Sequence, residues 1–274
     1  PAHEHYPRLN TVIMESTYGG VKDIQPSRKD ALIQLRDIIK RTLDSKGHVL
    51  IPVFAIGRSQ EVMIVIEQLV RNKEIESVPV YLDGLIYEAT AIHTAYPEYL
   101  NSTLRNIIFQ SGDNPFLSKI FQRVDHREKR EAIMGNPEPC IVLATSGMLS
   151  GGPVMEYLKA WAEEENSTLV FVGYQAEGTI GRRIQKGWKD ITYTEKGHPV
   201  TITLKMNVAT CDSFSGHSDR KQLITYLQKI SPRPSRVILC HGEETKTLEL
   251  AAGIQKRTKY ETAVMSNLET VRLK

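Results

Sequence analysis

The sequence predicts an α/β protein in which a parallel sheet is covered on both faces by helices. Short runs of branched apolar residues, such as 48–53 and 79–82, alternate with longer segments whose apolar residues recur at helical spacing, such as 29–44. Parallel strands need crossover connections of this length, so the alternation favours βαβ units. With 274 residues, of which 41% are hydrophobic and 24% charged, the chain is long enough for one large or two compact domains.

The same alternation gives the remaining elements in chain order. Ser27 is expected to cap the helix 29–44, and residues 57–61 open the next helix. The other segments follow from the spacing of their apolar residues. Strands are expected over residues 9–15, 140–144, 168–173, 201–208, 237–240, 262–265 and 270–273, and helices over 83–104, 121–133, 220–230 and 245–257.

Charge and cysteine content indicate which partners and which cellular compartment to expect. The net charge of +3 and the pI near 8.7 permit a nucleic-acid partner without requiring one. Three cysteines without paired spacing are typical of a reducing compartment, so we expect a cytoplasmic protein. No apolar run approaches the roughly 18 residues of a membrane span and no signal pattern opens the chain, so no membrane partner is expected. The missing initial Met indicates a piece of a longer polypeptide.

Three polar side chains stand at the ends of expected strands or in the turns that follow them. Glu15 ends the strand 9–15, His217 lies in the turn before the helix 220–230, and His241 follows the strand 237–240. Because the carboxyl ends of parallel strands meet at one edge of a sheet, these residues are expected to converge there. Their wide separation in sequence excludes a local metal motif.

The turn around His217 has two open interpretations. The hydroxyls of Ser215 and Ser218 and the first backbone N–H groups of the helix can hold an anion, while the imidazole moves a proton near neutral pH. Alternatively, Ser218 or Asp219 caps the helix and His217 is a polar turn residue. Glu15 is likewise either a residue that takes part in the reaction or a rim residue that caps a loop. Cys240 precedes His241 on its strand and is expected to point into the core.

Other segments carry weaker signals for nucleic-acid binding. Residues 175–189 form the most concentrated basic segment and could neutralise a phosphate backbone. The Ser/Gly-rich turn 145–153 either offers backbone N–H groups to an anion or simply reverses the chain. Three tyrosines of the segment 83–104 either stack on bases or pack at the edge of the core: Tyr87, Tyr96 and Tyr99.

Seven short motifs occur in one order along the chain and together carry a family resemblance. They are ESTYG (15–19), IPVFAIGRSQE (51–61), NPF (114–116), ATSGM (144–148), GYQAEGT (173–179), SFSGHSD (213–219) and CHGE (240–243). The chain resembles the β-CASP branch of the metallo-β-lactamase superfamily, in particular the archaeal endoribonucleases similar to the cleavage and polyadenylation specificity factor. The resemblance covers essentially the whole chain.

This resemblance implies an αββα metallo-β-lactamase domain with a Rossmann-like β-CASP parallel-sheet domain inserted in it. Residues 1–19 and 205–274 then belong to the metallo-β-lactamase domain, and residues 20–204 form the β-CASP domain. The family's activity is zinc-dependent RNA phosphodiester hydrolysis with two metal ions. The expected enzyme is an endoribonuclease that acts in mRNA 3′-end processing, and an additional 5′-to-3′ exoribonuclease activity is left open.

The family's functional residues map onto five positions of this sequence. Glu15 matches the acid that orients the second signature histidine. His217 matches that histidine, the general acid that protonates the leaving oxygen. His241 matches a ligand of one of two zinc ions, and a histidine at this position marks RNA-processing members. Ser215 and Ser218 match positions that hold the substrate phosphate.

The sequence departs from the family pattern in its zinc ligands. The family's His-x-His-x-Asp-His motif, a further His and a bridging Asp should precede Glu15, and the stretch His3-Glu4-His5 is no substitute for them. One imidazole does not hold two zinc ions, because a catalytic zinc needs about three protein ligands. The chain alone is therefore expected to be inactive and without zinc, with the missing ligands in a preceding segment or a separate chain. RNA is the expected substrate, and the family implies a homodimer through residues 267–274.

Two alternatives to an enzyme are open at this point. The same family contains members that keep the fold and lose the metal site, so the chain could be a non-catalytic RNA-binding or scaffold subunit of a processing complex. A nucleotide-binding α/β domain would need a Gly-rich phosphate loop directly after the first strand. The sequence Tyr18-Gly19-Gly20 is not that pattern.

Overall fold

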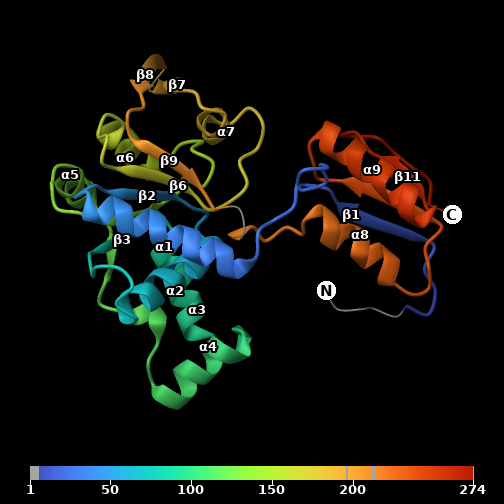
Figure 1. Cartoon of the computed structure of the whole chain (residues 1–274), viewed down its shortest axis with the longest axis horizontal. Coiled ribbons are helices and arrows are strands. Elements are labelled where there is room, and N and C mark those ends of the chain that lie inside the picture. Colours follow the sequence, from blue (N-terminus) through green and yellow to red (C-terminus); the bar gives the residue numbers. More distant parts are fainter. Residues whose placement is uncertain (1–5, 196, 212–213, 274) are drawn as a thin grey trace. The chain divides into compact units, whose positions relative to one another are not determined.

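The computed structural model describes residues 6–195, 197–211 and 214–273 and divides into two compact units. The larger unit is Ser27–Ser215, and the smaller one combines Pro1–Pro26 with Gly216–Lys274. Figure 1 shows the elements of each unit in chain order. The domain boundaries expected from the family resemblance, after residues 19 and 204, stay predictions. The stretch His3-Glu4-His5 lies outside the described residues.

The larger unit is built on a six-stranded parallel sheet with the strand order β4-β3-β5-β2-β6-β9. Its strands are β2 (Val49–Pro52), β3 (Val80–Asp83), β4 (Phe121–Val124), β5 (Ile141–Ala144), β6 (Thr168–Phe171) and β9 (Asn207–Thr210). The central strands β2 and β5 are buried at every residue, as expected for strands with helices on both faces.

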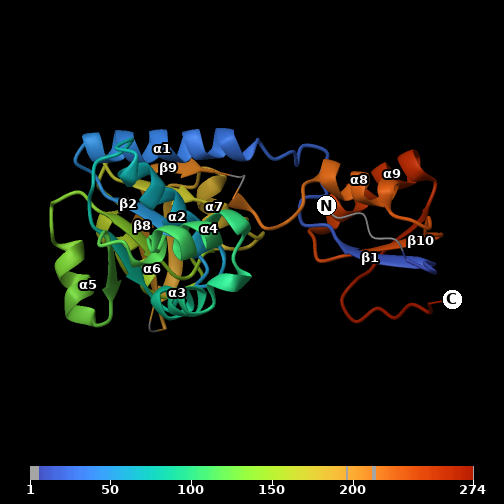
Figure 2. The same cartoon turned by 90° about the horizontal axis from the view of Figure 1, so that it is seen from below.

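Helices of the larger unit lie on both faces of this sheet (Figures 1 and 2), and each face carries a buried core. They are α1 (Arg28–Asp44), α2 (Arg58–Arg71), α3 (Ile86–Ala95), η1 (Pro97–Tyr99), α4 (Ser102–Asn106), η2 (Ile107–Ser111), η3 (Pro115–Leu117), α5 (Arg127–Met134), α6 (Pro153–Trp161) and α7 (Ile180–Gln185). α1 and α2 bury Ile39 and Ile66 in one core, and α6 buries Tyr157 and Trp161 in the other. Ser27 caps α1 as predicted, since its hydroxyl accepts the N–H of Asp30.

The smaller unit is a three-stranded parallel sheet with the order β1-β10-β11. Its elements are β1 (Thr11–Glu15), α8 (Arg220–Lys229), β10 (Arg236–Cys240), α9 (Glu244–Thr258) and β11 (Glu261–Val264). Both helices pack against Val12 and Leu239 in one core, which includes Leu227 and Leu250. Ile13, the next residue along β1 after Val12, points to the opposite face, where its side chain is 60% exposed.

Three expected elements were wrong. The strand expected over 201–208 is two strands, because the backbone N–H groups of Lys205 and Met206 both bond to the carbonyl of Ala162 and interrupt it. The helix expected over 121–133 begins as the edge strand β4, which pairs with β3 along its whole length. Residues 270–273 form no strand.

A fourth expected element was also wrong, and one hairpin was not predicted. The segment expected as one helix over 83–104 is divided into α3, η1 and α4, because Pro97 cannot continue the hydrogen bonding of α3. An antiparallel hairpin of β7 (Asp190–Glu195) and β8 (His198–Thr203) follows α7 and buries Ile191 and Ile202 in the core that also contains the buried residues of α6. Among the described residues, no helix is both long and apolar enough to cross a bilayer.

Candidate catalytic and metal site

The three residues expected at strand ends do meet in the smaller unit. Glu15 is the last residue of β1 and pairs in register with Cys240, the last residue of β10, so His241 emerges beside it. His217 lies two residues before Asp219, which forms a parallel bridge with Tyr18 in the turn after β1. The ends of two neighbouring strands and the entry to α8 therefore supply one side chain each.

The ligand atoms of these three residues converge to within 4.8 Å of one another. His217 Nδ1 lies 3.2 Å from Glu15 Oε2, and the two imidazoles are stacked with their centroids 5.4 Å apart. The side chain of His217 is 37% exposed and that of Glu15 28% exposed, so both are reachable from solvent. A carboxylate and two imidazoles in this arrangement are suited to proton transfer or to binding a divalent metal.

Thr17 connects the two histidines and was not predicted as a site residue. Its hydroxyl donates to the carbonyl of His241 at 3.1 Å, and it lies 3.1 Å from Nδ1 of His241 and 3.4 Å from Nδ1 of His217. Because its proton goes to the carbonyl, the hydroxyl oxygen can accept a hydrogen bond from Nδ1–H of His241. In the tautomer that makes this hydrogen bond, Nε2 of His241 carries the lone pair that a metal needs.

The backbone around His241 is shaped by close contacts. His241 has φ 50°, a left-handed conformation that is uncommon for a residue with a Cβ. A Cβ on Gly242 would lie 2.4 Å from the Ser16 hydroxyl, so only glycine fits directly after the histidine. Ser16 is buried and donates to the carbonyl of Cys240 at 2.8 Å. These contacts hold the turn after β10 against the turn after β1.

The turn after β1 is itself anchored by α8 and α9. Arg220 at the start of α8 donates to the carbonyl of Gly19 and, at 2.9 Å, to that of Glu249. Burial lowers the pKa of this guanidinium from its ordinary value. Lys246 of α9 forms an ion pair with Asp23 at 3.1 Å. The turn that carries Thr17 therefore has partners on both helices.

The two serines expected to bind phosphate belong to different units. Ser215 is the last residue of the larger unit, and Ser218 belongs to the smaller one. Asp219 caps α8: its carboxylate accepts the N–H of Gln222 at 2.8 Å, and the Gln222 side chain accepts the N–H of Asp219. The capping part of the alternative interpretation is thus confirmed for Asp219, while the phosphate-binding roles of both serines stay predictions.

Cys240 is half-buried rather than fully in the core, and its thiol lies 3.5 Å from the carbonyl of Met14. The three cysteines of the chain are free thiols. Tyr87, Tyr96 and Tyr99 are exposed, which does not fit the alternative that they pack at the edge of the core.

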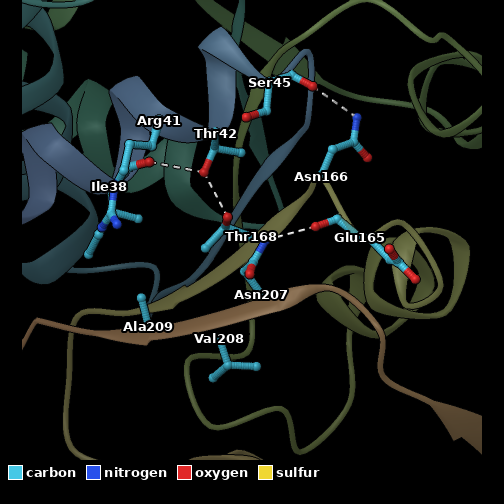
Figure 3. Close-up of a pocket in the computed structure, with 10 residues that line it drawn as sticks. All are labelled: Ile38, Arg41, Thr42, Ser45, Glu165, Asn166, Thr168, Asn207, Val208 and Ala209. Atoms are coloured by element: carbon cyan, nitrogen blue, oxygen red, sulfur yellow. Dashed lines mark hydrogen bonds between the residues drawn. The ribbon is translucent and has the colours of Figure 1, made fainter.

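A hollow of about 600 Å³ in the larger unit lies at the amino ends of its strands (Figure 3). It is lined by the end of α1 and the beginnings of β6 and β9, and Thr42 and Thr168 share a hydrogen bond of 2.7 Å across it. Asn207 donates to the carbonyl of Glu165 at 2.8 Å. Ligands of parallel sheets bind at the carboxyl ends of strands, so this amino-end hollow is a poor candidate for catalysis.

Comparison with known proteins agrees with this fold. A model described as the β-CASP domain matches residues 59–184, and one described as the Zn-dependent metallo-hydrolase RNA specificity domain matches residues 201–265. The chain therefore belongs to the β-CASP branch of the metallo-β-lactamase superfamily, and the predicted family and fold class are confirmed.

Curated proteins that are similar to this chain include archaeal transcription termination factors. The chain is 56% identical over 274 residues to "Transcription termination factor FttA" of Methanosarcina mazei, with 100% of this chain and 43% of that protein covered. It is 50% identical over 275 residues to the FttA of Methanocaldococcus jannaschii, again covering 100% and 43%. It is 47% identical over 270 residues to the FttA of a Lokiarchaeum species, covering 98% and 42%. The chain thus spans less than half the length of these relatives.

Proposed function

We propose that this chain is part of a zinc-dependent ribonuclease that acts at RNA 3′ ends, and that it supplies the general acid and one zinc ligand. The observation that carries the proposal is the convergence of Glu15, His217 and His241 at the carboxyl ends of two parallel strands. The family models support hydrolysis of RNA, and the name of the relatives, termination factor, fits an enzyme that acts on a transcript.

The residues fit a zinc site only in part. His241 meets the requirement for a ligand, because its Nδ1 is engaged by Thr17 and its Nε2 remains for the metal. Glu15 and His217 are engaged with each other at 3.2 Å. Since a catalytic zinc takes about three protein ligands, the site of two zinc ions needs ligands from outside these residues. When bound, zinc would supply Lewis-acid stabilisation of the charge that develops on the phosphate.

The exposed face of the three-stranded sheet supports the proposal that another part of the protein packs against it. Ile13 is 60% exposed on the face opposite α8 and α9, where an apolar side chain gains from being covered. We propose that a preceding segment of the same protein covers this face and carries the other ligands. The expected homodimer through residues 267–274 remains part of the proposal, and the exposure of Leu268 and Leu273 in this stretch supports it.

In this proposal Glu15 positions His217 and does not bind metal. The carboxylate accepts Nδ1–H of His217, so the proton to be transferred is the one on Nε2. That proton goes to the oxygen of the leaving nucleotide as the phosphodiester bond breaks. Ser215 and Ser218 are proposed to hold the substrate phosphate, in both endonucleolytic and 5′-to-3′ exonucleolytic cleavage.

The test is the variant His217→Ala in the longer protein that carries this chain. We expect RNA cleavage to fall by about 100-fold to 10,000-fold, the usual contribution of a positioned general acid. RNA affinity should stay within about twofold, since the acid acts on the leaving group and adds little to binding. The matched control is His198→Ala, which removes an exposed histidine from the hairpin strand β8.

Two outcomes would count against the assignment. Cleavage by His217→Ala at the wild-type rate would show that another group donates the proton. If the wild-type protein binds RNA and does not cleave it in the presence of zinc, the chain belongs to a non-catalytic, scaffold-like member of the family.

A further inference from the structure

The basic segment after β6 ends in a rigid turn. α7 ends at Gln185, and the turn that follows contains Gly187, which has φ 89° and whose N–H bonds to the carbonyl of Ile184 at 2.9 Å. The N–H of Trp188 bonds to the carbonyl of Arg183 at 3.1 Å. These two hydrogen bonds define a Schellman motif. Two positions of this motif usually carry apolar side chains that contact each other, and in this chain those positions are occupied by Arg183 and Trp188. The position of Trp188 is therefore set by the backbone.

In place of the apolar contact, this turn has a cation–π pair. The guanidinium of Arg183 lies over the indole of Trp188, 5.6 Å from the centroid of the ring. The side chain of Trp188 is still 53% exposed. The other tryptophan, Trp161, is fully buried in the core. A large aromatic surface beside a fixed positive charge is thus presented to solvent at the end of α7.

The surrounding charge is positive. Residues 177–190 contain four cations and two carboxylates. Glu177 takes ion pairs from both Arg182 and Lys186, at 3.4 Å and 2.7 Å. Within the described part of the chain, no ion pair involves Arg183 or Lys189. The positive charge beside the exposed indole is therefore not neutralised locally.

We propose that Trp188, Arg183 and Lys189 form a contact for single-stranded RNA outside the histidine site. A base stacks on the indole, and the two cations face the phosphates on either side of it. Aromatic platforms flanked by cations bind single strands with little sequence preference, because every base has a π face. This inference rests on the proposed function only in taking RNA as the ligand.

A second cation–π pair in the same unit provides a matched comparison. The guanidinium of Arg123 lies over the ring of Tyr87, 5.0 Å from its centroid. Arg123 also forms an ion pair with Glu88, so its charge is balanced. If an exposed ring next to an arginine were sufficient, both pairs would bind RNA equally. The balance of charge favours the pair at Trp188.

The test measures tryptophan fluorescence of the 274-residue chain during titration with a 12-nucleotide oligoadenylate. Because Trp161 is buried, emission that responds to the ligand comes from Trp188. We expect quenching on binding and about a tenfold weaker affinity for Trp188→Ala, the typical loss for one stacked base. Trp188→Phe, which keeps a ring, should lose less, and Tyr87→Ala should stay within about twofold of wild type.

The outcomes separate this inference from the proposed function. The contact at Trp188 would be overturned if wild type, Trp188→Ala and Tyr87→Ala bind RNA with equal affinity and RNA does not quench the wild-type fluorescence. That result would leave the assignment of the histidine site untouched. An equal loss in Trp188→Ala and Tyr87→Ala would overturn the charge argument. If inorganic polyphosphate displaces the oligoadenylate completely, and the oligoadenylate does not quench the fluorescence of Trp188, then the chain recognises the phosphates alone. If the wild-type chain binds no RNA, both this contact and the choice of RNA as ligand fail.

Discussion

Glu15 and Asp83 occupy the same topological position in two different parallel sheets, since each is the last residue of its strand. Asp83 is 1% exposed, and the guanidinium of Arg130 donates to both of its oxygens at 2.8 and 2.9 Å. The hydroxyl of Tyr157 donates to the same carboxylate at 2.9 Å. Glu15 is accessible to solvent and faces His217. The two carboxylates therefore differ in their partners and not in their place on the sheet.

The partners determine what each carboxylate can do. The hydrogen bond to Asp83 raises the pKa of Arg130 above its ordinary value, and burial raises the pKa of Tyr157. Neither partner changes charge near neutral pH, so this network fastens α5 and α6 to the end of β3. The partner of Glu15 is a histidine, whose imidazole can both accept and release a proton during a reaction. In this chain the partner of each strand-end carboxylate, and not its place on the sheet, separates Glu15 from Asp83.

The largest expected effect on stability comes from breaking the Asp83 network. Arg130→Met leaves a buried carboxylate without its cation, so we expect the free energy of unfolding to fall by about 3–5 kcal/mol. Chemical unfolding of the 274-residue chain measures this loss. The matched control is Arg127→Met in the same helix, which removes an exposed ion pair with Glu131 and should cost less than about 1 kcal/mol. Equal losses would mean that Asp83 is not a structural anchor.

A smaller effect is expected at Thr17, on the functional side of the comparison. Thr17→Val removes the hydroxyl that contacts both imidazoles and keeps the side-chain shape. We expect RNA cleavage by the longer protein to fall by about 10-fold to 100-fold, the usual cost of losing a group that orients a metal ligand. Thr17→Ser keeps the hydroxyl and should retain most of the activity. An unchanged rate for Thr17→Val would remove Thr17 from the site.

The site was predictable from sequence where the pattern of strands determines it. Because Glu15 ends β1 and His241 directly follows the neighbouring parallel strand β10, expecting the two strand ends to meet was enough to bring these residues together. Thr17 was missed because its role depends on a tautomer and on distances of about an ångström, which no spacing encodes. The left-handed backbone of His241 has no sequence signal either, apart from the glycine that follows it.

The errors in the fold have similar causes. β4 has the sequence FQRV and precedes a charged helix, so its short edge pairing with β3 had no apolar pattern to reveal it. The strand β7 did carry a signal: Ile191 and Tyr193 alternate with threonines at a period of two residues. That alternation could have identified the hairpin, because Gly197 lies in the short stretch between β7 and β8.

The central claim is that Glu15 and His217 act as a proton-transfer pair and that only His241 binds metal. The most direct measurement is zinc per chain in the 274-residue protein, by plasma mass spectrometry after exhaustive dialysis. We predict a value near zero, because one imidazole does not retain zinc. A value near one would mean that Glu15, His217 and His241 hold a metal together, which would contradict the roles assigned to Glu15 and His217.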